Sequence, residues 1–120
     1  MHVLVIFDRG AIDSKAYVNP EQWSRILGRV GVTEGQLLSC YYQVVHMVTA
    51  AIGAEAHYRL EGERTESLQQ AQDRDRATEQ AWSGHGCWDK VDNSTNMQGK
   101  VDRLIQVCLF VCFDRLQLTI

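Results

Sequence analysis

An acid and an arginine follow directly after an apolar run near the start of the chain. The run VLVIF occupies positions 3–7, and Asp8 and Arg9 come next. An unbroken run rich in β-branched residues predicts a strand buried on both faces, and such strands belong to parallel sheets covered by helices. In open α/β sheets, ligands bind at the carboxyl ends of the strands. Asp8 and Arg9 are therefore the leading candidates for a functional site.

A second group of candidate residues lies in the charged stretch at positions 53–80, where apolar anchors are sparse. We expect a solvated loop followed by a helix from about Ser67, because Ser67-x-x-Gln70 matches a capping box. The helix could be exposed and carry weak ion pairs. Alternatively, it could be a mobile lid whose arginines close over a polyphosphate. The charges alone favour the exposed helix.

The elements between these groups can be outlined from caps and periodicity. Asn19-Pro20-Glu21 predicts a helix start, and Gly31 predicts its end. Its apolar positions have helical spacing and are expected to face the sheet: Trp23, Ile26, Leu27 and Val30. A capping box at Thr33 opens a short second helix.

The apolar run at positions 44–48 predicts a second buried strand, so the two helices before it would form a β-α-β crossover. His46 interrupts this run, and we interpret it as a core histidine whose polar atoms are satisfied. Positions 87–91 predict a shorter third strand that ends at Asp92-Asn93. A last helix is expected from about Met97, and positions 110–120 form a tail without assigned structure.

Composition limits the classes of function. The 120 residues are 45% apolar and 22% charged, which predicts one packed domain. A net charge of −3 gives no basic field for nucleic acid. The four cysteines are irregularly spaced and are expected to be reduced. The longest apolar stretch is about ten residues, against the roughly twenty that a membrane-spanning helix needs, so we expect no transmembrane segment. We expect a cytoplasmic protein, which could also associate with the surface of a membrane.

Four ordered features resemble a known family: FDRGAIDSKAY, HMVTAA, the RTES…AQDRDR segment, and VDN followed by Lys100. They look like the later half of a NadR/Ttd-type AAA domain. This P-loop NTPase family is related to nicotinamide riboside kinase and includes the nucleotide-binding half of the TRPL translocation defect proteins. The resemblance covers roughly residues 3–107. It implies an α/β, P-loop kinase-like three-layer fold: a parallel sheet with flanking helices, in which residues 1–109 are the C-terminal portion and 53–86 a lid-like insertion.

The resemblance also implies roles for individual residues, with Mg²⁺ and ATP or GTP as the bound groups. Asp8 would be the Walker-B-like acid that holds Mg²⁺ or accepts a proton from the attacking hydroxyl. Arg9 would contact phosphate or substrate, and Asp13 and Tyr17 would shape the acceptor pocket. The remaining nucleotide- or phosphate-contacting positions implied by the family are Arg64, Arg76, Asp92 and Asn93.

One departure from the family pattern is large. The sequence contains no G-x-x-x-x-G-K-[ST], and Gly99-Lys100 lies inside a helical pattern. We therefore expect a chain truncated before the Walker B strand, in which the P-loop strand is absent. The strands at 3–7 and 44–48 would then lie roughly 9 to 10 Å apart, two inter-strand spacings, with unpaired edges. Such a chain should be marginally stable and prone to aggregation.

Three functional hypotheses follow. The first is a regulatory module that binds ATP or GTP and is linked to phosphoinositides or trafficking proteins. The second is a kinase for a small nucleoside or ribosyl substrate. The third is a truncated product without independent activity. Without a phosphate-binding loop, we expect no significant turnover from these residues alone.

Overall fold

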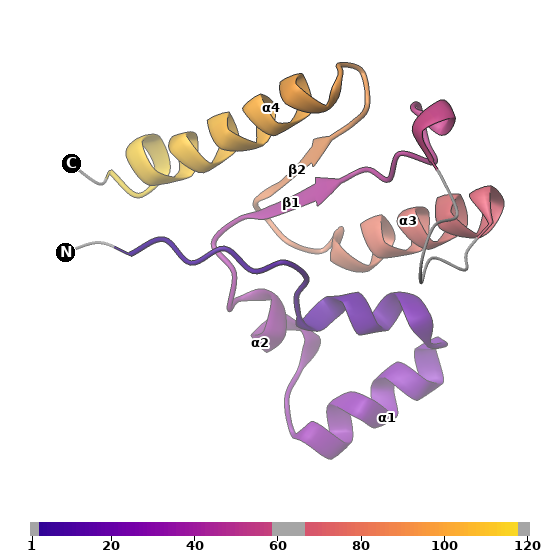
Figure 1. Cartoon of the computed structure of the whole chain (residues 1–120). Coiled ribbons are helices and arrows are strands. Elements are labelled where there is room, and N and C mark those ends of the chain that lie inside the picture. Colours follow the sequence, from indigo (N-terminus) through magenta and orange to yellow (C-terminus); the bar gives the residue numbers. More distant parts are fainter. Residues whose placement is uncertain (1–2, 59–66, 118–120) are drawn as a thin grey trace.

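A computed structural model describes residues 3–58 and 67–117 of the chain. Its strands are short and its helices carry most of the structure (Figure 1). In chain order the elements are η1 (Ala11–Tyr17), α1 (Pro20–Val30), α2 (Glu34–Leu38), β1 (Val44–Met47), η2 (Glu55–His57), α3 (Leu68–Trp82), β2 (Trp88–Val91), α4 (Met97–Phe110) and η3 (Val111–Arg115). The last of these, in the tail left unassigned from the sequence, is one turn of π-helix.

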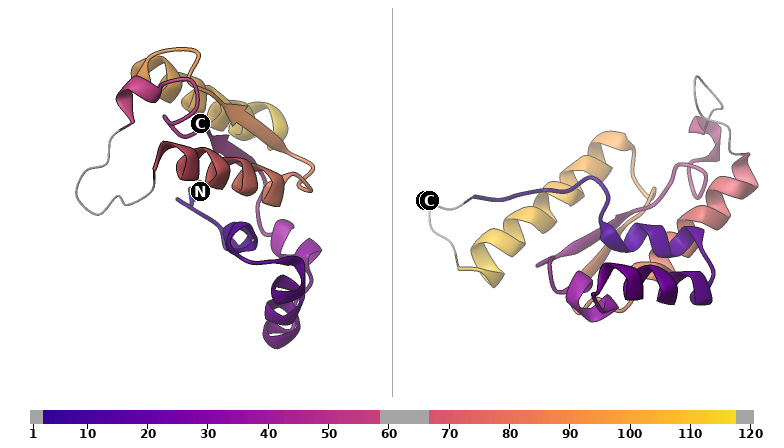
Figure 2. Two further views of the ribbon diagram at one scale, coloured as in Figure 1. Left: turned by 90° about the vertical axis from the view of Figure 1, so that its right-hand side faces the viewer. Right: turned by 90° about the horizontal axis from the view of Figure 1, so that it is seen from below.

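The sheet of the described chain consists of β1 and β2, which pair in parallel from Val44↔Trp88 to Met47↔Val91. The connection between them contains α3, so this is a β-α-β unit. Figures 1 and 2 show α3 and α4 on opposite sides of the strands. The expected α/β class is confirmed at this level, as helices around a small parallel sheet, and the expected strands at 44–48 and 87–91 are both present.

Local capping explains where the helices begin and end. Asn19, Thr33 and Ser67 each accept a hydrogen bond from the backbone N–H three residues later, as predicted. Gly31 ends α1 in the left-handed conformation, with φ of 79°. The predicted start of the last helix at Met97 is also confirmed, with Asn96 as its N-cap.

The N-terminal segment, residues 3–7, does not form the predicted buried strand. It is extended, and its five apolar side chains are between 51% and 72% exposed. No backbone hydrogen bond joins it to any other described residue. The prediction was wrong because a strand is buried only if another strand pairs with it and helices cover its faces. Here β1 and β2 pair with each other, so the crossover expected between residues 3–7 and 44–48 does not form either.

The largest apolar cluster lies beside the sheet and not within it. Ile12, Trp23, Ala81 and Trp82 are buried together where η1 meets α1 and α3. The prediction that one face of α1 packs on the sheet was wrong: Trp23 is buried in this cluster, while Ile26 and Val30 remain exposed. Figure 1 shows why: η1 separates α1 from the strands.

The chain is less compact than a closed domain of its size. Its radius of gyration is 16.2 Å, against about 13.6 Å expected for 120 residues. Its accessible surface is 8588 Å², against roughly 6,600 Å² expected for 13.6 kDa. About 2,000 Å² more surface is therefore exposed than a compact fold would leave. No helix in the described ranges is both long and apolar enough to cross a membrane.

Candidate functional site

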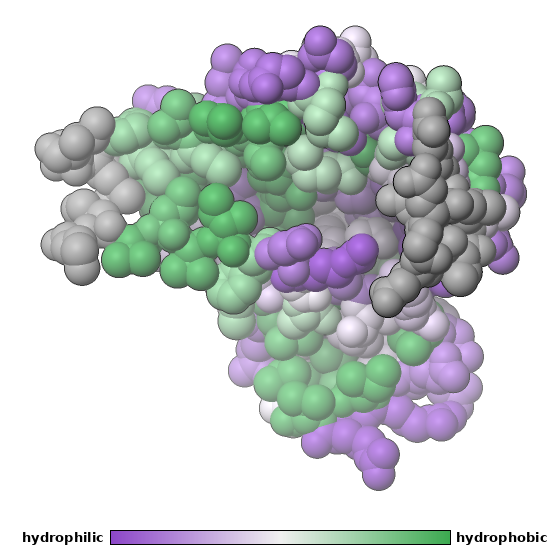
Figure 3. All heavy atoms as spheres, in the orientation of Figure 1, coloured by the Kyte–Doolittle hydropathy of each residue, from purple (hydrophilic) through white to green (hydrophobic). Residues whose placement is uncertain are grey.

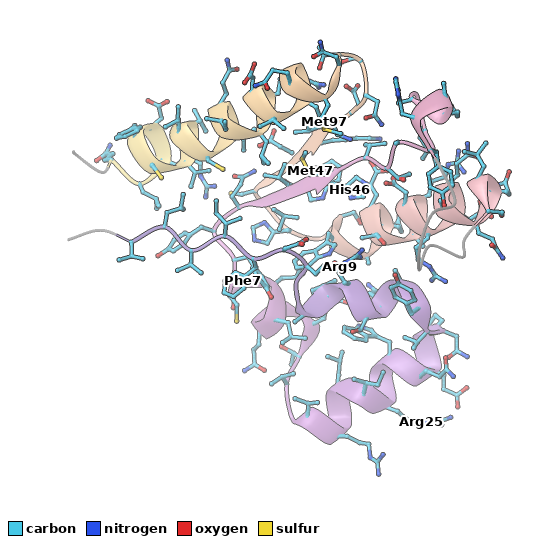
Figure 4. The ribbon with its side chains drawn as sticks, viewed as in Figure 1. Phe7, Arg9, Arg25, His46, Met47 and Met97 are labelled. Carbon is cyan, nitrogen blue, oxygen red and sulfur yellow. The ribbon has the colours of Figure 1, made fainter. Side chains whose placement is uncertain are left out.

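A buried histidine–aspartate pair links β1 to α3. His46 Nε2 lies 2.9 Å from Asp75 Oδ1, and Asp75 Oδ2 accepts a 2.7 Å hydrogen bond from the Thr49 backbone N–H. Burial raises the pKa of Asp75, but the hydrogen bonds from His46 and Thr49 outweigh it, and the pKa lies below its ordinary value. An ionised carboxylate only accepts, so His46 Nε2 carries the proton. The interpretation of His46 as a satisfied core residue is confirmed (Figure 4).

A lysine–asparagine pair closes the carboxyl end of β1. Lys100, only 6% exposed, donates from Nζ to the Val48 carbonyl at 2.5 Å and to Asn93 Oδ1 at 2.8 Å. Asn93 Nδ2 in turn donates to the carbonyls of Thr49 and Ile52. Burial lowers the pKa of Lys100, and the Asp75 carboxylate partly offsets this by raising it. The burial of Lys100 was not predicted from the sequence, although its position four residues before Leu104, on an apolar helix face, was a usable signal.

Asp92 follows β2 at the same end of the sheet, as predicted. Hydrogen bonds from Ser94, and then from Arg103, lower the pKa of Asp92 to about 2. Arg103 Nη1 lies 2.9 Å from Asp92 Oδ1, and its Nη2 donates to the Asp92 carbonyl. Asp92 is therefore an ionised acid whose carboxylate already accepts hydrogen bonds from Ser94 and Arg103.

In the described part of the chain, one group of side chains has the spacing of metal ligands. The ligand atoms of His46, Asp75 and Glu79 lie within 4.8 Å of one another. Each is already engaged, because His46 and Asp75 pair together and Glu79 Oε1 lies 2.9 Å from Lys90 Nζ. A cation would have to displace the His46 proton and the Lys90 ammonium. The group is better explained as a network of structural ion pairs.

Asp8 and Arg9 form an exposed turn after the N-terminal segment. Arg9 has φ of 76°, in the left-handed region that non-glycine residues seldom adopt. Its guanidinium is 69% exposed and approaches Asp13 only to 4.0 Å, while Asp8 makes no hydrogen bond or ion pair with any residue that the structure describes. Unusual backbone geometry of this kind is often found at binding sites. These two charged groups are available to a ligand.

Asp13 and Tyr17, implied as pocket residues, attach η1 to α3. Asp13 Oδ1 accepts a hydrogen bond from Trp82 Nε1, and the guanidinium of Arg74 lies 3.9 Å from the centre of the Tyr17 ring. Gly10 makes this approach possible, because a Cβ there would meet the Trp82 ring at 2.6 Å.

The arginines expected on the charged helix are only partly described. Arg76 is exposed on α3 and lies 3.5 Å from Asp73 of the same helix. Arg74, which was not predicted from the sequence, contacts η1: it lies over the Tyr17 ring and donates to the Ala16 carbonyl. Arg64 lies outside the described residues.

The candidate residues thus divide into two groups. The first group lies around the turn before η1 and consists of Asp8, Arg9 and Asp13. Two contacts with Tyr41 hold this turn: the Phe7 ring packs edge-on against the Tyr41 ring, and the Ala11 backbone N–H donates to the Tyr41 hydroxyl. The other group, Asp92 and Asn93, lies beyond the carboxyl end of β2. No hydrogen bond or ion pair within the described ranges joins the two groups directly.

Comparisons with protein-family models, with curated proteins and with solved structures found no match for this chain, so the family resemblance stays a prediction and the function has to be inferred from the residues themselves.

Proposed function

We propose that the chain is a nucleotide-binding module of the P-loop NTPase type, which binds ATP or GTP with Mg²⁺ and acts by binding instead of turnover. One observation carries the proposal: at the left-handed turn, Asp8 has no partner among the described residues, and Arg9 is 69% exposed and approaches Asp13 only to 4.0 Å. An exposed guanidinium beside an unpaired carboxylate suits an Mg²⁺-polyphosphate, because one contacts the phosphate and the other the metal.

The residues of the turn fit the metal chemically. Mg²⁺ keeps several of its waters and is commonly bound through one or two carboxylates together with the phosphates of the nucleotide. Asp8 offers a solvent-exposed carboxylate, and Arg9 beside it offers a cation for the anionic ligand. Asp8 would hold the ion directly or through water.

Absence of turnover is expected from the sequence. The chain contains no G-x-x-x-x-G-K-[ST], the loop whose backbone N–H groups hold the β- and γ-phosphates during transfer. Binding through Asp8 and Arg9 alone would not position a nucleophile in line with the γ-phosphate.

Fluorescent ATP and GTP analogues titrated with and without Mg²⁺ test the proposal. We expect binding that strengthens with Mg²⁺ and no phosphate release. Asp8→Asn should weaken binding about tenfold with Mg²⁺ and have little effect in EDTA, because only the metal-mediated contact is removed. Asp102→Asn, an equal change of charge at an exposed position on α4, is the matched control and should bind as wild type does.

Two results would overturn the proposal. One is no binding of either nucleotide at millimolar concentration. The other is an Asp8→Asn variant that binds as tightly as wild type with Mg²⁺ present. Circular dichroism of each variant establishes that folding is unchanged.

A further inference from the structure

Two apolar features are left largely uncovered by the described residues, although the Phe7 ring contacts that of Tyr41 edge-on. The N-terminal segment, residues 3–7, is extended and unpaired, and α4 with η3 exposes a stripe at four-residue spacing, formed by Val101, Ile105, Leu109 and Phe113. Figure 3 shows the N-terminal segment and the C-terminal half of α4 as green areas on the same face of the molecule. Monomers seldom expose contiguous apolar patches larger than a few hundred Å². Five large side chains that are at least half exposed already reach that size.

The surplus of exposed surface is more than twice what one partner buries in a typical dimer interface. The chain exposes about 2,000 Å² more than a compact protein of its mass, and a stable interface commonly buries about 800 Å² on each partner. The N-terminal segment and the α4 stripe together can supply this area. Neither includes a charged residue, so burying these side chains themselves desolvates no ionised group.

The N-terminal segment is complementary to itself. In an antiparallel pair related by a twofold axis at Val5, Val3 lies opposite Phe7 and Leu4 lies opposite Ile6. Residues of the same parity then share a face, so both faces of the pair are apolar throughout. The Asp8 carboxylates of the two copies lie at opposite ends of the pair, so they do not repel each other strongly.

We propose that the N-terminal segment is the interface of a symmetric homodimer, in which residues 3–7 of two copies pair as antiparallel strands and the exposed stripe of α4 contributes to covering them. Two strands alone are marginally stable in water, so helical cover is required. In the dimer, the apolar side chains of residues 3–7 and of the α4 stripe, which are exposed in a single copy, become buried.

Sedimentation equilibrium on the whole chain tests this proposal. We expect wild type to have twice the monomer mass of 13.6 kDa. Val5→Lys, at a position 62% exposed in the monomer, should remain folded and become monomeric, because it places like charges at the twofold axis. Val30→Lys is the matched control: Val30 is 66% exposed at the end of α1, outside the interface, and this variant should still dimerise.

Proline substitutions distinguish strand pairing from general apolar association. The N–H groups of Val5 and Ile6 point to opposite edges of the segment, so only one of them faces the partner strand. Either Val5→Pro or Ile6→Pro therefore removes a hydrogen-bond donor to the partner, and both variants keep an apolar side chain. At least one should be monomeric. A monomeric wild type, a dimeric Val5→Lys, two dimeric proline variants, or open-ended larger assemblies would each overturn the proposal.

Discussion

Residues 3–7 and 44–48 are two apolar runs of equal length with opposite outcomes. The second run forms β1, pairs with β2, and is fixed to α3 through His46 and Asp75. The first run is at least as rich in β-forming residues, yet it remains unpaired and exposed. The difference is a partner strand and a buried polar anchor, since both runs have the intrinsic preference for extended structure. Strand preference alone therefore does not bury a segment.

The largest effect is expected from removing Asp75, the side chain that fixes β1 to α3. Asp75→Ala should lower the free energy of unfolding by about 3 to 5 kcal/mol, because it leaves His46 and the Thr49 N–H buried without their acceptor. Asp73→Ala, on the same helix but 65% exposed, loses only surface contacts with Gln69 and Arg76 and should change it by less than about 0.5 kcal/mol. Urea unfolding followed by circular dichroism measures both. Equal effects of the two substitutions would show that the pair does not anchor β1.

A smaller effect is expected from shortening equivalent side chains in the two runs. Val48→Ala should cost about 2 kcal/mol, because Val48 is buried beyond β1 and its methyl groups would leave a cavity. Val5→Ala should cost less than about 0.5 kcal/mol when measured at a concentration at which the chain is monomeric. Thermal unfolding by calorimetry provides the comparison. If Val5→Ala were as costly in the monomer, the N-terminal segment would have to be buried there.

The smallest effect concerns pH. The pKa of Asp75 is lower in the folded chain than its ordinary value of 3.8, so the folded state binds fewer protons than the unfolded state. This contribution to stability is complete above about pH 4 and is lost as pH falls through the folded pKa. Asp75→Asn should therefore flatten the pH dependence of unfolding below about pH 4, whereas Val5→Ala should leave it unchanged. An unaltered slope in Asp75→Asn would assign the acid sensitivity to other carboxyl groups.

The sequence predicted the elements whose signals are local. Caps at Asn19, Thr33 and Ser67 each act within four residues, and the helix starts they predict are confirmed. The strands at 44–48 and 87–91 were also predicted correctly, as was the place of Asp92 and Asn93 after the second. The burial of residues 3–7 was not, because it depends on a pairing partner elsewhere in the chain, which periodicity does not report.

The same distinction holds for the candidate residues. Asp8 and Arg9 were selected because they follow an apolar run, a feature visible in the sequence, and they are exposed and available. The partners of Asp13 and Tyr17 could not be predicted, since Trp82 and Arg74 are more than fifty positions further along the chain. These contacts depend on how η1 packs against α3.

The register of the sheet has a consequence for synthesis of the chain. Val44 and its partner Trp88 are separated by 44 positions, which a ribosome takes about 2 to 9 s to add at 5 to 20 residues per second. Arg115, which hydrogen-bonds to the Tyr42 carbonyl and Gln43 Oε1 just before β1, is added later still. During that interval the nascent chain presents both apolar runs to the solvent at once. A chaperone that binds extended apolar segments would find two targets in the same chain, only one of which is later buried by folding of the chain itself.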